Sequence, residues 1–241
     1  MLCAIIGAGA GLSAGIARRF RREGFDVALV SRRAPLSGAE EPGGGGAGRL
    51  RAFRGDAAGD LAETFAALAA WGGPPEVLVY NAAVLRPGLA SRLGPEEALA
   101  DLETNLGGAL RSVQAVLPAM RARGRGSLLF TGGGLALEPY PEWASLAAGK
   151  AALRAYAIAL GKELAGQGIG VSAIAVCGLV ESGGAFDPDR LAEVYWRLHR
   201  LPPDRVPREV VYLPAGADPY YNDPAGRWRA VSRPIVAAGL P

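Results

Sequence analysis

The sequence predicts an α/β fold, a single domain built on a doubly wound parallel sheet with helices on both faces. Short apolar runs of four to six β-prone residues alternate with longer helical patterns. A glycine-rich turn joins the first of these runs to the first helical pattern. The chain has 241 residues, of which 50% are hydrophobic and 20% charged, so it is long enough to bury one sizeable core.

The predicted elements follow in order from the amino terminus. Leu2–Ile6 is an apolar run, and after the glycine turn a helical pattern continues through Arg22 and is closed by Gly24. Val27–Val30 is the next strand, and residues 35–48, PLSGAEEPGGGGAG, are expected to form a Pro- and Gly-rich loop. Further strands are expected at Leu50–Phe53, Val77–Tyr80, Ser127–Phe130 and Val171–Val176. Helices are expected at Leu61–Trp71, Pro95–Arg123 (one helix or two) and Ala144–Leu164.

The regular alternation fades from Gly178 onward. Pro188–His199 is predicted to form a helix, and Glu209–Leu213 a last strand. The proline-rich segment 214–241 is expected to wrap the surface or to contact another subunit. No internal repeat interrupts the chain, so residues 1–241 are predicted to form one domain.

Composition excludes several classes of protein. The net charge of +3 comes from interspersed basic and acidic residues rather than a basic stripe, which disfavours nucleic-acid binding. Cys3 and Cys177 lie far apart without a CxxC spacing, and His199 is the only histidine, so no metal site is expected and a reducing, cytoplasmic setting is indicated. The chain shows no signal-peptide pattern and no apolar run long enough to cross a membrane.

The glycine turn predicts dinucleotide binding. Gly7, Gly9 and Gly11 follow a strand and open a helix. Glycine there permits a positive φ and lets a pyrophosphate approach backbone N–H groups at the helix N-terminus. Tight turns also use glycine for steric reasons alone, but the strand before it and the helix after it favour the binding interpretation and a Rossmann-type fold.

The end of the second strand favours NADP(H) over NAD(H). Ser31-Arg32-Arg33 stands there, with no Asp or Glu that would take a ribose 2′-hydroxyl. A guanidinium can instead pair a 2′-phosphate through two hydrogen bonds. The alternative is that both arginines belong to a solvated loop.

Taken together, these motifs resemble the short-chain dehydrogenase/reductase family over about residues 2–182. The resemblance implies that the dinucleotide is bound by the glycine motif and by further residues with their own counterparts in the family. The matching motifs are Ile6-Gly7, Gly11-Leu12-Ser13, Asp56, Asn81-Ala82-Ala83, Cys177-Gly178-Leu179-Val180, Ser182 and Lys150. Within them, the residues expected to bind the cofactor are Gly7, Gly11, Leu12, Asp56, Asn81, Ala82, Ala83, Gly178, Val180, Ser182 and Lys150. It implies that Asn105 and Lys150 belong to the catalytic tetrad, and that residues 183–241 supply a substrate-covering helix and a tail.

Two catalytic positions depart from that family's pattern. The tyrosine four residues before the lysine falls at Leu146, and the serine falls near Gly133. Hydride delivery to a ketone creates an alkoxide, which a phenol beside an ammonium can protonate. Such an acid typically contributes about 10² to 10⁴ in rate, and leucine cannot replace it.

Lys150 is expected to keep a role of its own. It lies on an inward-facing helical stripe otherwise made of Leu146, Leu153, Ala157, Leu160 and Leu164. A buried ammonium is costly unless it is paired, and the ribose hydroxyls of a dinucleotide would pair it. The alternative is that Lys150 reaches solvent from the helix start.

Other side chains could replace the missing acid. Tyr140 lies in the loop EPYPEW and Thr131 lies close to the position of the lost serine. Tyr195 and His199 lie on the last helix, where they also fit an amphipathic face. Tyr140 is the preferred candidate, with Thr131 second.

The sequence therefore predicts an atypical NADPH-dependent oxidoreductase that reduces a carbonyl or imine of a small, largely apolar organic substrate. The alternative is a protein of the same fold without net redox activity, either a cyclase or isomerase or a cofactor-binding regulator; altered glycine-motif positions such as Ser13 would then indicate a weakened site. A homodimer or homotetramer is expected, and no nucleic-acid or membrane partner.

Overall fold

The computed structural model describes residues 1–33 and 45–239. Most of the predicted 35–48 loop lies outside the described residues. The described strands form one sheet in the order β3-β2-β1-β4-β5-β6-β7, and every neighbouring pair is parallel. The strand order changes direction once, between β3 at one edge and β4 beside β1, so the sheet is doubly wound as predicted.

The observed elements agree closely with the sequence prediction. The strands are β1 (Leu2–Ile6), β2 (Asp26–Ser31), β3 (Leu50–Arg54), β4 (Val77–Tyr80), β5 (Gly126–Thr131), β6 (Ile169–Val176) and β7 (Glu209–Tyr212). The helices are α1 (Leu12–Arg22), α2 (Ala62–Gly72), α3 (Pro95–Leu102), α4 (Gly108–Arg123), α5 (Ala144–Glu163) and α6 (Pro188–Arg200). Between α3 and α4 the chain makes a π-helical turn, η2 (Glu103–Gly107).

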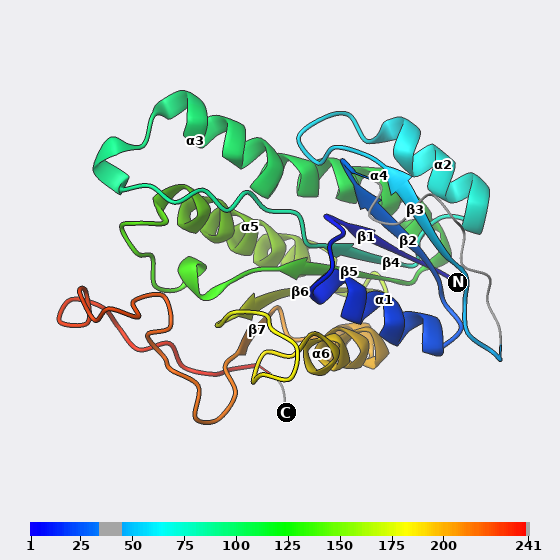
Figure 1. The fold of residues 1–241 in the computed structure, drawn as a ribbon. Coiled ribbons are helices and arrows are strands. Elements are labelled where there is room, and N and C mark those ends of the chain that lie inside the picture. Colours follow the sequence, from blue (N-terminus) through cyan, green and yellow to red (C-terminus); the bar gives the residue numbers. More distant parts are fainter. Residues whose placement is uncertain (34–44, 240–241) are drawn as a thin grey trace.

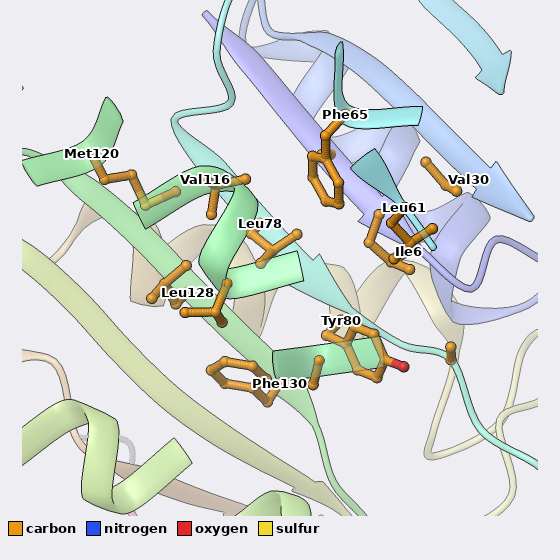
Figure 2. Close-up of a cluster of buried hydrophobic side chains, with 14 of the residues drawn as sticks. Ile6, Val30, Leu61, Phe65, Leu78, Tyr80, Val116, Met120, Leu128 and Phe130 are labelled. Carbon is orange, nitrogen blue, oxygen red and sulfur yellow. The ribbon is translucent and has the colours of Figure 1, made fainter. Parts of the chain in front are cut away.

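Helices cover both faces of the sheet (Figure 1). On one face, α2, α4 and α5 pack on a core that includes Phe65, Val116 and Leu153. Figure 2 shows part of this core, with Leu78, Leu128 and other strand residues meeting side chains from the helices. On the other face, α1 and α6 pack on a second core. Because both faces are covered, the inner strands β1, β4 and β6 are wholly buried.

Helix α6 lies along α1. A Cβ at Gly15 of α1 would stand 2.4 Å from the carbonyl oxygen of Pro188, so this contact requires glycine. Farther along α6, Trp196 and His199 pack against the rings of Phe20 and Phe25. The structure therefore places α6 beside α1 on the same face of the sheet, where α6 buries its apolar stripe.

The tail after β7 folds back across the loop between β5 and α5. Val211 and Ala238 form an antiparallel bridge. The indole Nε1 of Trp228 donates to both carboxylate oxygens of Glu142, at 3.1 and 3.2 Å. The tail thus contacts this loop, whereas α6, the helix that was expected to cover the substrate, packs on α1.

The packing of His199 makes stability depend on pH. Burial lowers the pKa of His199 below its ordinary value of 6.5, and its Nδ1 lies 2.9 Å from the hydroxyl of Ser127. The unfolded chain therefore binds the proton more readily than the folded protein. We expect the free energy of unfolding to fall as pH drops below 6.5, and His199→Gln to reduce this dependence in urea titrations between pH 5 and 8. Equal pH slopes for both proteins would contradict the prediction.

Candidate functional site

The glycine turn brings the carboxyl ends of three strands together. Gly7 has a φ of +87°, and its N–H and that of Ala8 both donate to the carbonyl of Val30, each at 2.9 Å. A Cβ at Gly7 would lie 2.3 Å from the backbone nitrogen of Ala82. Position 7 therefore admits only glycine, both for its backbone conformation and for the close approach of β4.

Ser13 fastens this turn to the end of β4. Its hydroxyl donates to the carbonyl of Gly7 at 3.1 Å. The amide of Asn81 donates to the Ser13 oxygen at 2.8 Å and to the Gly7 carbonyl at 3.3 Å. The serine, which departs from the family's glycine motif, thus stabilises the turn by hydrogen bonds instead of opening it.

A cavity of about 580 Å³ lies at this edge of the sheet. Eight of the residues predicted to bind the cofactor line it: Gly7, Ser31, Arg32, Arg33, Asp56, Asn81, Ala82 and Ala83. The volume is that of a typical ligand site. The steric requirement for glycine at its mouth and the two exposed arginines on its wall fit a phosphorylated dinucleotide.

Seven other predicted residues, all in the described part of the chain, lie outside this lining: Gly9, Gly11, Leu12, Lys150, Gly178, Val180 and Ser182. Gly9 and Gly11 are exposed in the turn, and Leu12 is buried at the start of α1. Val180 lies within 3.9 Å of a Cβ built on Gly11, so the segment after β6 approaches the glycine turn. Ser182 is exposed.

Sequence reasoning missed several residues of the cavity lining, among them Leu85 and Thr104. Leu85 follows the Asn81-Ala82-Ala83 stretch and is 70% exposed. Thr104 lies in η2, one residue before Asn105. Only adjacency to a predicted residue could have indicated either, because neither carries a chemical signature in the sequence.

Lys150 is buried, so the alternative that it reaches solvent is wrong. Its Nζ donates to the carbonyl of Thr131 at 2.7 Å. Burial lowers the pKa of this ammonium from 10.5 to about 8. Keeping a positive charge buried beside a neutral carbonyl costs free energy. Hydroxyl or anionic groups of a ligand that accept hydrogen bonds from Lys150 would lower this cost.

Asn105 is also buried, and it packs against the residue before Lys150. A Cβ at Gly149 would lie 2.6 Å from the amide nitrogen of Asn105. The amide oxygen accepts from the backbone N–H of Val84 at 2.8 Å, whereas the amide nitrogen has no hydrogen-bond partner among the described residues. The structure thus brings the two predicted tetrad members to neighbouring positions.

Tyr140 packs beside Leu146. Both belong to a small apolar cluster with Leu135 and Ala147, against which Ala83 of the cavity wall and Trp228 of the tail also pack. Tyr140 is 2% exposed, and its buried hydroxyl has no hydrogen-bond partner in the described part of the chain. An unpaired buried phenol is unfavourable unless a ligand or a reacting group completes it.

The other candidate donors have partners on the α6 side of the sheet. The hydroxyls of Thr131 and Tyr195 lie 2.8 Å apart, and burial raises the pKa of Tyr195. His199 pairs with Ser127, near the amino end of β5. Of the four sequence candidates, Tyr140 is the one that shares a cluster with Leu146.

The doubly wound parallel sheet, with a glycine turn at the mouth of its cavity, defines a Rossmann-type α/β protein. The model of the short chain dehydrogenase family matches residues 2–185. The chain therefore belongs to this family of oxidoreductases.

Individual relatives agree with this assignment. A 3-oxoacyl-[acyl-carrier-protein] reductase of Bos taurus is 31% identical over 176 residues, which cover 72% of this chain and 73% of the relative. A metagenomic short-chain oxidoreductase in complex with NADP superposes with a TM-score of 0.79 at 27% identity, covering 89% of this chain and 97% of the other. For serine dehydrogenase from Escherichia coli the TM-score is 0.75 at 26% identity, over 89% and 98% of the two chains.

Two further findings concern metals and membranes. Across residues 1–33 and 45–239, no three His, Cys, Asp or Glu side chains cluster closely enough to hold a metal ion. No helix within the same ranges is both long enough and apolar enough to span a bilayer.

Proposed function

We propose that the protein is an NADPH-dependent reductase of a carbonyl or imine in a small, largely apolar organic substrate, working without the tyrosine of the family. The observation that carries this proposal is the cavity in which the glycine turn, Arg32 and Arg33 meet. The NADP complex of a related oxidoreductase supports the choice of cofactor. The name of the curated relatives, 3-oxoacyl-[acyl-carrier-protein] reductase, supports carbonyl reduction as the reaction class.

Different residues would bind different parts of the dinucleotide. Backbone N–H groups of the turn from Gly9 to Leu12 would hold the pyrophosphate at the N-terminus of α1. Arg32 and Arg33 would pair the 2′-phosphate, and Lys150 would donate to ribose hydroxyls. NADPH, when bound, would supply the hydride.

The proton must come from another group, because Leu146 stands at the position of the family's acid. Tyr140 is our proposed donor. It packs beside Leu146, and its hydroxyl has no hydrogen-bond partner among the described residues. Lys150 and Asn105 lie on the adjoining elements α5 and η2. A phenol in this position would give its proton to a developing alkoxide.

Cofactor choice gives a direct test. We expect Arg32→Ala/Arg33→Ala to weaken NADPH binding by about tenfold, while NADH binding changes by less than about twofold, because only the 2′-phosphate contacts are lost. Isothermal titration calorimetry with both dinucleotides measures this, and the exposed Arg22→Ala serves as a control for the loss of a positive charge outside the cavity. Equal losses for both dinucleotides would count against a 2′-phosphate site.

Redox activity is tested by following NADPH oxidation with a panel of ketones, imines and quinones. Turnover of any panel member supports reduction. Tight NADPH binding with no oxidation would favour the alternative, a cyclase, isomerase or cofactor-binding regulator. The observation that keeps this alternative open is that the hydroxyl of Tyr140 is buried.

A further inference from the structure

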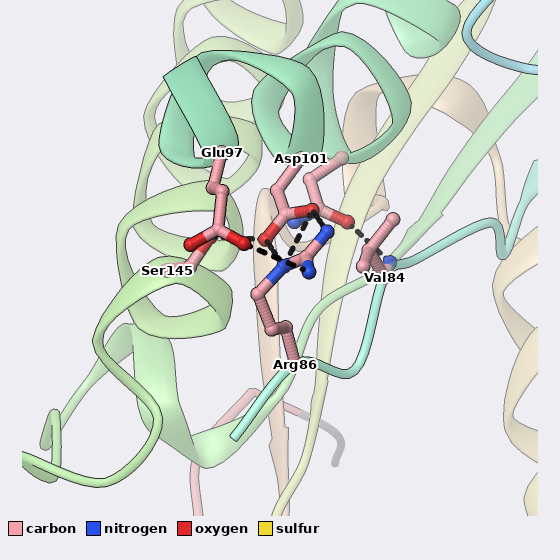
Figure 3. Close-up of polar contacts among 6 residues, drawn as sticks. Val84, Arg86, Glu97, Asp101 and Ser145 are labelled. Carbon is pink, nitrogen blue, oxygen red and sulfur yellow. Dashed lines mark hydrogen bonds and ion pairs between the residues drawn. The ribbon is translucent and has the colours of Figure 1, made fainter. Parts of the chain in front are cut away.

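One face of α3 and η2 carries three polar side chains one turn apart, Glu97, Asp101 and Asn105. This spacing of four residues aligns them on the same side of the helix. Each of the three contacts the segment that leaves β4: Glu97 and Asp101 pair with Arg86, and Asn105 accepts from the N–H of Val84. Figure 3 shows Arg86 directed at Asp101, with Glu97 and Ser145 close by.

Asp101 is at the centre of this arrangement. Its side chain is 2% exposed, and its two carboxylate oxygens accept from Arg86 Nε at 3.0 Å and Nη2 at 3.1 Å. The hydroxyl of Ser145 donates to the same carboxylate at 2.6 Å. The Arg86 guanidinium, helped by Ser145 and opposed by burial, holds the pKa of Asp101 below its usual range. The carboxylate is therefore charged and well satisfied at neutral pH.

The groups that Asp101 joins both lie next to the proposed active site. Arg86 follows the wall formed by Asn81, Ala82, Ala83 and Leu85, all of which line the cavity. Ser145 is the second residue of α5, one residue before Leu146 and five before Lys150. Between β4 and η1 (Ala90–Arg92) the backbone of this wall forms an isolated β-bridge at its far end, between Gly88 and Trp143, so the position of the stretch before that bridge depends in large part on such side-chain contacts.

We propose that Asp101 is a positioning residue for the dinucleotide, which acts by fixing the wall after β4 to the helix that carries Lys150. It acts through Arg86 and Ser145 and does not touch the ligand itself. The inference rests on the proposed function in one respect: the ligand is taken to be NADPH. A buried pair that served global stability alone would affect unfolding without changing the local order of residues 81–88.

The test compares two substitutions, Asp101→Asn and Glu97→Gln, each of which neutralises an acid that pairs with Arg86. Asp101→Asn keeps the shape and an acceptor for Ser145 but loses the charged pair, while Arg86, 41% exposed, can still be hydrated. We expect about tenfold weaker NADPH binding and faster amide exchange in residues 81–88, with unchanged exchange in the strands. Glu97→Gln, at a side chain that is 58% exposed and 3.4 Å from the same guanidinium, is the matched control and should change affinity by less than twofold.

The readouts are the NADPH Kd, the emission of the bound nicotinamide and hydrogen exchange by mass spectrometry. Unchanged affinity and unchanged exchange at residues 81–88 in Asp101→Asn would overturn the proposal. Equal acceleration over the whole chain would assign the pair to global stability and would also overturn it. If the wild type binds no NADPH, the proposed function fails, and the exchange data for the cofactor-free protein still decide whether Asp101 orders the wall.

Discussion

Replacing Lys150 with methionine is expected to stabilise the cofactor-free protein while weakening NADPH binding by about 100-fold. Burial lowers the pKa of Lys150 from 10.5 to about 8, which at about 1.36 kcal/mol per pH unit corresponds to a cost of about 3 kcal/mol for keeping the charge. Methionine fills a similar volume without that cost. It loses the hydrogen bond to Thr131, about 1 kcal/mol, so the expected net gain is about 2 kcal/mol.

The effect on binding has the opposite sign. In the proposed complex the ammonium donates charged hydrogen bonds to ribose hydroxyls, each of which contributes about 1.5 to 3 kcal/mol. Loss of one or two such bonds corresponds to a Kd about 100-fold higher. A variant that is more stable and yet binds less tightly would show that the lysine serves ligand binding and not folding.

The dependence on pH gives an internal check. The unfolded chain holds the lysine proton up to about pH 10.5, whereas the folded protein releases it near pH 8. The stability advantage of Lys150→Met should therefore be full below pH 8 and decline between pH 8 and 10.5. Urea titrations over this range measure it, with the exposed Lys162→Met, the chain's other lysine, as control. An advantage that does not decline with pH would contradict the buried-charge explanation.

The fold was predictable because strands buried on both faces are continuous apolar runs. Val77–Tyr80 was predicted with the observed bounds, and the other strands differ by at most two residues at either end. The segment Pro95–Arg123 was left open as one helix or two, and the structure interrupts it with η2. That interruption depends on tertiary contacts, namely Asn105 packed against Gly149 and the Tyr80 hydroxyl bonded to the carbonyl of Thr104. No local pattern encodes these contacts.

Eight of the residues predicted to bind the cofactor line one cavity, because a glycine turn and strand-end residues act through backbone geometry that leaves a trace in sequence. The side-chain pairs that hold the remaining parts of the site in place join residues that are distant in sequence. Arg86 and Asp101 are 15 residues apart, and Trp228 reaches Glu142 across 86 residues. Single charged or aromatic residues of this kind are indistinguishable from solvated surface residues until the fold brings them together.

Replacing Tyr140 with phenylalanine is expected to lower kcat for carbonyl reduction by about 100-fold, the lower end of the range for loss of a general acid. The substitution removes only a hydroxyl that has no hydrogen-bond partner among the described residues. Stability should therefore stay constant or rise by up to about 1 kcal/mol, because an unsatisfied buried polar group is removed. NADPH affinity should not change, because Tyr140 lies outside the cavity lining.

This combination separates a proton donor from a packing residue. A packing role alone predicts little change in either stability or kcat, since phenylalanine keeps the ring of Tyr140 and its contact with Leu146. The measurements are kcat for a substrate that the wild type reduces, thermal unfolding and NADPH titration, with Tyr220→Phe in the tail as a control that retains its ring contact with Arg229. If kcat of Tyr140→Phe equals that of the wild type while turnover continues, the proton must come from water or from the substrate. Leu146 would then mark a site that has lost its need for a protein acid.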